Sequence, residues 1–214
     1  MTTAPALTRA TLLQAVAELT ARDPLLAGIV GRFGPPPLWS RPRGFPTLVR
    51  IILEQQVSLG SAAASFARLQ EAVGPAVLPD DVLRLGPAGL QSLGFTRQKA
   101  RYVAGLAGVL VAKELSLQRV AHLPDAAAHD ALVAIPGIGP WTAGVYLLMA
   151  LRRPDVWPPG DLGLHKSMAE VIGLATVPTS AEAGAIAQQW RPWRAVAARL
   201  LWHSYLSRRN RSNR

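Results

Sequence analysis

A carboxylate at the end of a short rigid loop is the first group in this sequence that could do chemistry. Asp161 follows Pro158, Pro159 and Gly160 and precedes a helical pattern that starts at Leu162. Aspartate in this place commonly caps the helix, which contributes ~1 kcal/mol to stability. The same carboxylate can stabilise positive charge in a transition state or activate a water molecule. The two roles are compatible, because capping fixes the side chain.

A glycine-rich hairpin between two helical segments is the second candidate site. Residues 132–143 read LVAIPGIGPWTA, in which Pro136 ends one helix and Pro140 suits the first turn of the next. Gly137 and Gly139 permit positive φ or the close approach of another molecule to the backbone. Amides at a helix N-terminus attract anions such as the phosphates of a nucleic acid. An ordinary turn closed by glycine is the alternative interpretation.

The helix expected at residues 46–57 carries two amides on its apolar stripe. Leu48, Ile51 and Ile52 set the stripe by their i, i+3, i+4 spacing, and the next two positions on it are Gln55 and Gln56. Either the stripe has left the core at a helix end, or it opens into a polar cleft.

Helical signals extend along the whole chain around these segments. Alternating β-branched runs are missing, and Ala, Leu, Arg and Gln dominate the periodic segments, which predicts an all-α protein. We expect one lobe from residues 1–45 together with 152–214, and a second lobe from residues 46–151. The expected helices cover residues 8–21, 24–33, 46–57, 59–73, 80–85, 87–93, 96–113, 125–134, 140–151, 162–172, 180–189 and 193–207.

The composition limits the classes of protein that remain. A net charge of +10 favours a polyanionic partner such as nucleic acid, although a genome rich in G and C would also raise the arginine content. The absence of cysteine excludes disulfides, thiolate zinc sites and iron–sulfur clusters. No apolar run reaches the ~20 residues of a membrane helix, and the N-terminus lacks the pattern of a signal peptide. These features predict a cytoplasmic protein without a membrane partner.

Four motifs in a fixed order resemble the helix–hairpin–helix DNA glycosylase superfamily. The hairpin sequence PGIGPWTA is followed, 22 residues after Gly139, by Asp161, as the family's hairpin is followed by its catalytic loop. EQQVS at 54–58 and LGFTRQKA at 93–100 also resemble family segments. WRPWR at 190–194, with Trp202 on the helix after it, is similar to the 3-methyladenine DNA glycosylase II branch.

The resemblance implies two helical lobes with a cleft between them. It also implies a monofunctional glycosylase that removes alkylated bases of the 3-methyladenine type in base excision repair, with Asp161 as the catalytic carboxylate. An alkylated purine is cationic, so it leaves without a general acid, and indole faces attract it. The base is turned out of the duplex. The side chains expected to line its pocket are Trp141, Trp202, Val145 and Tyr146.

The same match implies how the chain holds DNA. Gln56 takes the position of the family's intercalating side chain, which fills the gap left by the extruded base. The other expected DNA contacts are Gly137, Gly139 and Thr142. Catalysis is expected to need no cofactor, but the family's hairpin carbonyls hold a monovalent cation, which anchors a phosphate. The carbonyls at those positions belong to Val133, Ile135 and Ile138.

Two departures from the family pattern refine the expectation. Bifunctional members carry a catalytic lysine where this chain has Trp141, so no Schiff base with the sugar can form and strand cleavage is not expected. The related branch tends to have tyrosine where this chain has Val145, which predicts a more open base pocket.

Other functions remain open at this point. A glycosylase for oxidised or deaminated bases would use the same fold, and a non-catalytic helix–hairpin–helix module would bind DNA without Asp161. A helical scaffold with no nucleic-acid partner is the third alternative. For the glycosylase we expect double-stranded DNA with damaged bases as the partner, a monomeric state, and a location at the nucleoid.

Overall fold

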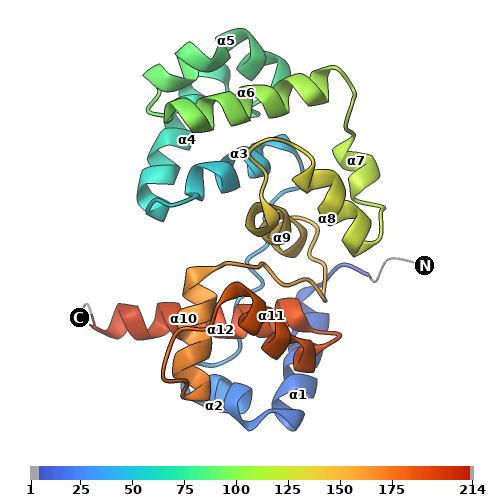
Figure 1. Cartoon of the computed structure of the whole chain (residues 1–214), viewed down its shortest axis with the longest axis vertical. Coiled ribbons are helices and arrows are strands. Elements are labelled where there is room, and N and C mark those ends of the chain that lie inside the picture. Colours follow the sequence, from blue (N-terminus) through green and yellow to red (C-terminus); the bar gives the residue numbers. More distant parts are fainter. Residues whose placement is uncertain (1–4, 213–214) are drawn as a thin grey trace. The chain divides into compact units, whose positions relative to one another are not determined.

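The structure, a computed structural model, describes residues 5–212, and every regular element in that range is a helix (Figure 1). This confirms the all-α fold. The elements are α1 (Arg9–Arg22), α2 (Pro24–Phe33), α3 (Phe45–Glu54), α4 (Leu59–Val73), α5 (Pro79–Ser92), α6 (Arg97–Val111), α7 (Leu117–Val120), α8 (Asp125–Val133), α9 (Pro140–Met149), α10 (Leu162–Ile172), α11 (Ser180–Ala187), the 3-10 turn η1 (Gln188–Trp190) and α12 (Arg194–Ser212).

Small polar side chains begin many of these helices. Thr8, Ser58, Thr96 and Thr179 each accept a hydrogen bond from the backbone amide three residues later. Such caps satisfy amides that the helix itself leaves without a partner. The local sequence therefore determines most helix starts, as expected for short-range signals.

The described chain divides into two compact units. Residues 41–146 form the first, called here the hairpin unit, and residues 5–40 with 147–212 form the second, called the terminal unit. The sequence predicts the boundaries between the lobes at 45/46 and 151/152. Each lies five residues further along the chain than the structural boundary, at 40/41 and 146/147. The structural boundary at 146/147 lies within α9.

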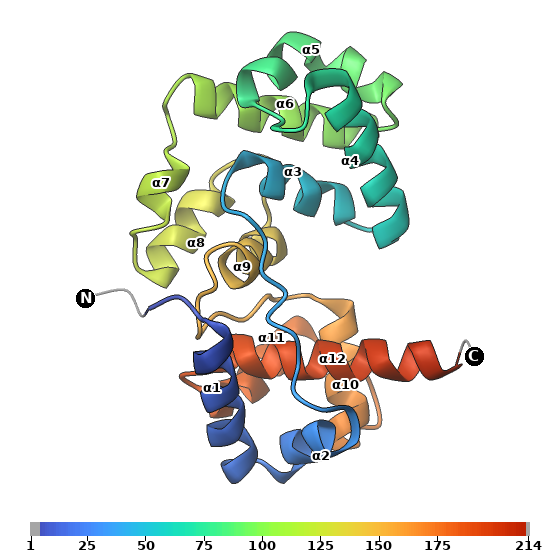
Figure 2. The same cartoon turned by 180° about the vertical axis from the view of Figure 1, so that it is seen from behind.

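The core of the hairpin unit is built around α3. Its stripe residues Leu48, Ile51 and Ile52 are each 0% exposed, which confirms the apolar face expected for them. Helices α4 and α6 pack against α3, and α5 lies beside α6 (Figures 1 and 2). Helix α5 bends at Gly86, which has a positive φ and precedes Pro87.

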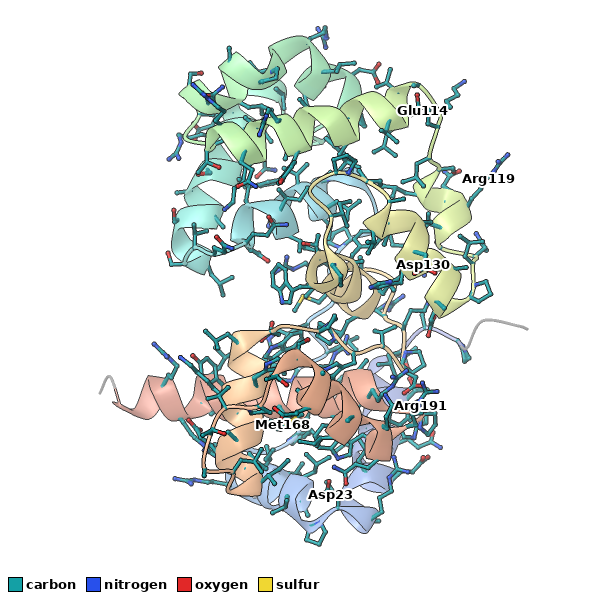
Figure 3. All side chains as sticks on the ribbon, in the orientation of Figure 1. Asp23, Glu114, Arg119, Asp130, Met168 and Arg191 are labelled. Atoms are coloured by element: carbon teal, nitrogen blue, oxygen red, sulfur yellow. The ribbon has the colours of Figure 1, made fainter. Side chains whose placement is uncertain are left out.

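Helix α12 is the central element of the terminal unit, where it packs against α1, α2 and α10 (Figure 2). Met168 of α10, labelled in Figure 3, is completely buried. Arg199 of α12 is also completely buried, and burial lowers the pKa of its guanidinium to about 10. The guanidinium donates to three backbone carbonyls, those of Leu38, Ala195 and Leu148. A buried cation is tolerated only when its donors are satisfied in this way.

Among the described residues, no helix combines the length and apolarity needed to cross a bilayer.

Candidate active site and hairpin

Asp161 lies at the start of α10 in the terminal unit. Gly160 before it has a positive φ, and the Asp161 side chain caps the helix by accepting from the Leu164 amide at 2.8 Å. The indole Nε1 of Trp202 donates to the same oxygen, Oδ1, at 3.1 Å. Two N–H donors from different helices therefore converge on one oxygen of a half-buried carboxylate.

The carboxylate has little room on the side of Gly163. A Cβ added at Gly163 would lie 3.2 Å from Asp161 Oδ1 and 3.6 Å from the Tyr205 ring. The missing side chain thus leaves space for the carboxylate in its held position. An anion fixed in this way is suited to stabilise positive charge that develops on a bound molecule.

Trp202 also belongs to an aromatic cluster that the sequence analysis does not include. Its ring lies edge-to-face with Trp39, with centroids 6.5 Å apart and ring planes at 74°. Trp39 makes a second edge contact with His203, at 6.2 Å. Trp39 has φ +45°, a left-handed conformation that costs an ordinary residue roughly 1–2 kcal/mol. No sequence pattern signals Trp39, because it lies outside every motif and far from Trp202 in the chain.

The hairpin lies between α8 and α9 in the hairpin unit, and its two glycines differ. Gly137 has φ +93°, and a Cβ there would lie 2.2 Å from the Tyr102 ring, so both backbone conformation and packing require glycine. A Cβ at Gly139 would meet no atom within 4 Å. The backbone at Gly139, just before the first turn of α9, is therefore accessible to a bound molecule.

Gln55 joins the hairpin to the end of α3. Its Nε2 donates to the Gly137 carbonyl at 3.0 Å and to Thr142 Oγ1 at 2.9 Å. Thr142 is only 1% exposed, so its hydroxyl serves this internal contact in the structure. The place of Gln55 on the apolar stripe is an unusual one for an amide, but nothing in the sequence indicates this contact.

Helix α3 was expected to reach residue 57, and that expectation is wrong, because the helix ends at Glu54. Lys99 of α6 donates from Nζ to the carbonyls of Leu53 and Gln55, at 2.7 and 2.8 Å, and thereby terminates the helix. Burial lowers the pKa of Lys99. Gln56 follows in a left-handed conformation, φ +56°, with an exposed side chain. The residue expected to enter the DNA therefore lies on an exposed turn.

The remaining pocket candidates lie on α9. Trp141 in its first turn is half-buried, whereas Val145 and Tyr146 are 2% and 0% exposed. The Tyr146 hydroxyl accepts a hydrogen bond from the Gly44 amide at 3.0 Å, and burial raises the pKa of this phenol. Trp141 and Tyr146 thus belong to the hairpin unit, while Asp161 and Trp202 belong to the terminal unit.

The carbonyls considered for a cation lie at the last residue of α8 and in the hairpin after it. Ile135 already accepts from the Ile138 amide at 3.0 Å, and a carbonyl oxygen has a second lone pair for a cation. In the described part of the chain, no three His, Asp or Glu side chains gather in a way that would hold a metal ion. A cation at this hairpin would therefore rely on the backbone of Val133, Ile135 and Ile138.

Comparison with known proteins supports the sequence motifs. The family described as HhH-GPD superfamily base excision DNA repair protein matches residues 49–192. A DNA-3-methyladenine glycosylase of Bacillus subtilis is 30% identical over 196 residues, which cover 86% of this chain and 65% of that protein. The chain thus spans just under two thirds of the length of this curated relative.

Two solved structures share the fold. A DNA-3-methyladenine glycosidase from Bacillus halodurans is 26% identical with a TM-score of 0.77, covering 92% of this chain and 91% of that one. The Schizosaccharomyces pombe 3-methyladenine DNA glycosylase, in complex with abasic DNA, is 23% identical with a TM-score of 0.78, covering 88% and 95%. The chain belongs to the HhH-GPD superfamily of base excision DNA repair proteins.

Proposed function

We propose that this chain is a monofunctional DNA glycosylase that hydrolyses the N-glycosidic bond of alkylated bases of the 3-methyladenine type in double-stranded DNA. The observation that carries the proposal is the carboxylate of Asp161, held on one oxygen by the Leu164 amide and the Trp202 indole. Its place 22 residues after the hairpin Gly139 matches the family pattern. Relatives named DNA-3-methyladenine glycosylase support the choice of substrate.

The chemistry follows from the charge of the reacting groups. As the glycosidic bond breaks, the sugar becomes positively charged, and the Asp161 carboxylate stabilises that charge and activates the attacking water. The alkylated base is itself cationic and leaves without a proton donor. Trp141 stands where a bifunctional enzyme has lysine, so the product is an intact strand with an abasic site.

The pocket for the extruded base is proposed to be formed by four side chains. Trp141 and Trp202 are half-buried and supply indole faces, whose attraction for a cation is worth ~0.5–2 kcal/mol. Val145 and Tyr146 are buried and would limit the space available to the base.

The DNA backbone is proposed to bind at the hairpin. The accessible backbone at Gly139 and the neighbouring Gly137 present amides to a phosphate, with Thr142 fixed beneath them by Gln55. A monovalent cation on the carbonyls of Val133, Ile135 and Ile138 would add positive charge there. Gln56, exposed on its turn, would fill the gap left by the base. We further propose that the protein acts as a monomer at the nucleoid in the cytoplasm.

The proposal is tested with a panel of duplexes, each carrying one modified base: an alkylated purine, an oxidised guanine, uracil or no lesion. We expect base release from the alkylated duplex, an uncleaved strand until alkali is added, and no covalent adduct after borohydride treatment. Release from oxidised or deaminated substrates alone would favour the alternative glycosylase. Binding without release would leave a DNA-binding module, and a trapped adduct would refute the monofunctional assignment.

Two substitutions test the proposed DNA contacts against each other. Gly139→Val should weaken binding to every duplex alike and lower the salt-dependence slope by ~1 for each lost phosphate contact. Gln56→Ala should slow excision from a paired site more than from a mismatched site, because an unpaired base costs less to extrude. Unchanged salt dependence would make the hairpin an ordinary turn, and equal losses on both substrates would place Gln56 outside the base stack.

A further inference from the structure

Trp39 combines a strained backbone with a specific set of contacts. Bulky residues seldom adopt a φ of +45°, and they keep it only where the surrounding structure holds them. Trp39 is half-buried, so filling the core does not explain its conformation. Residues strained in this way cluster at functional sites.

A buried guanidinium holds the peptide group that leads into Trp39. Arg199 Nε donates to the Leu38 carbonyl at 2.8 Å, while its other nitrogens donate to Ala195 and Leu148 carbonyls at 2.9 and 2.8 Å. The Leu38 carbonyl and the Trp39 amide share one peptide plane. Because that plane is held, the direction of the Trp39 N–Cα bond is held with it.

The Trp39 ring, held in this way, touches two consecutive residues of α12. It lies edge-to-face with Trp202 at 6.5 Å and 74°, and with His203 at 6.2 Å and 62°. His203 is anchored separately, since its Nε2 lies 3.0 Å from the Phe33 carbonyl. Edge-to-face contacts depend on ring orientation, so Trp39 restricts the rotation of the Trp202 indole.

The orientation of that indole matters because its Nε1 donates to Asp161 Oδ1 at 3.1 Å. We propose that Trp39 is a positioning residue for excision, which acts by holding Trp202 so that its N–H stays on the catalytic carboxylate. The inference rests on the proposed function, in which Asp161 carries the chemistry. It assigns a role to a residue outside the hairpin, the catalytic loop and the base pocket.

The experiment compares Trp39→Leu, which removes the ring, with Trp39→Phe, which keeps an aromatic edge. Trp39→Leu should lower the single-turnover excision rate about tenfold, the amount expected when a hydrogen bond to a charged group is weakened. Affinity for damaged DNA should change less than about twofold, and Trp39→Phe should retain most of the rate. The matched control is Trp193→Leu, since Trp193 is half-buried in the same unit and donates to Glu18 at 2.7 Å. It should excise normally.

A double-substitution cycle separates positioning from general packing. Trp202→Phe keeps an aromatic ring but removes the indole N–H donor. In that background, Trp39→Leu should therefore lower the excision rate by less than about a further twofold. Hydrogen exchange of the Trp202 indole N–H, identified by its absence in Trp202→Phe, should be faster in Trp39→Leu than in the wild type and Trp39→Phe. If Trp39→Leu does not fold, Trp39→Met takes its place with the same expectations.

The outcomes are distinct. If the wild type is active, three results would each overturn the role of Trp39 and leave the proposed function intact. They are full excision activity in Trp39→Leu, losses in the rate that multiply in the double-substitution cycle, and hydrogen exchange of the Trp202 indole that is unchanged in Trp39→Leu. A wild type that releases no alkylated base refutes the proposed function and this inference with it.

Discussion

Two aspartates of the terminal unit are held by the same kinds of donor. Asp161 caps α10 and accepts from the Trp202 indole, and Asp23, labelled in Figure 3, caps α2 and accepts from the Trp190 indole at 2.8 Å. They differ in which oxygens are used. At Asp23 the amides of α2 bind Oδ1 and the indole binds Oδ2, whereas at Asp161 the Leu164 amide and the Trp202 indole share Oδ1.

The difference distinguishes a structural carboxylate from the one that we propose to be catalytic. Asp23 uses both oxygens to attach α2 to Trp190, which is only 2% exposed, so its indole contact fastens the helix to a buried ring. Asp161 is followed by Leu162, which is 60% exposed, and by Gly163, which has no side chain. Both aspartates share a cap and an indole donor, so we expect their roles to depend on the surroundings of each carboxylate.

The largest expected effect distinguishes the two aspartates directly. Asp161→Asn keeps the size and most of the capping ability but removes the charge, so it should fold, bind damaged DNA and lose at least ~10² in single-turnover excision. Asp23→Asn is the matched control, with normal excision and a loss of stability of at most ~1 kcal/mol. Near-normal excision by Asp161→Asn, measured with excess enzyme on an alkylated duplex, would remove Asp161 from the mechanism.

A smaller effect should follow from crowding the held carboxylate. Alanine at position 163 would place its Cβ 3.2 Å from Asp161 Oδ1, which is closer than normal contact and would push the carboxylate out of its position. We expect Gly163→Ala to slow excision ~3–10-fold while thermal stability stays equal or rises, because alanine favours helix by ~1 kcal/mol over glycine.

Gly184→Ala on α11 is the control for this substitution, since a Cβ there meets nothing within 4 Å. It should leave the excision rate unchanged. If Gly163→Ala excises as fast as Gly184→Ala, the position of the carboxylate is less restricted than the structure indicates, and crowding beside Asp161 does not distinguish it from Asp23.

Local sequence was sufficient for several features of this protein. Proline and glycine at positions 158–160 and 136–140 end and begin helices through their own backbone restrictions, so the hairpin and the cap at Asp161 could be predicted from neighbouring residues. The periodic apolar stripe of α3 likewise predicted its buried face. The family followed from the order of such local motifs, and comparison confirmed it.

Other features depend on contacts between distant parts of the chain. Lys99 ends α3 from 44 residues away, Gln55 reaches the hairpin across 82, and Arg199 fixes the peptide before Trp39 across 161. These contacts could not be predicted from helix propensity, because a hydrogen bond between remote residues leaves no periodic pattern in the sequence. The sequence by itself thus identified the carboxylate proposed for catalysis and the hairpin proposed for DNA binding, whereas only the tertiary structure decided where α3 ends and which side chains surround Trp202, since those depend on atoms that folding alone brings together.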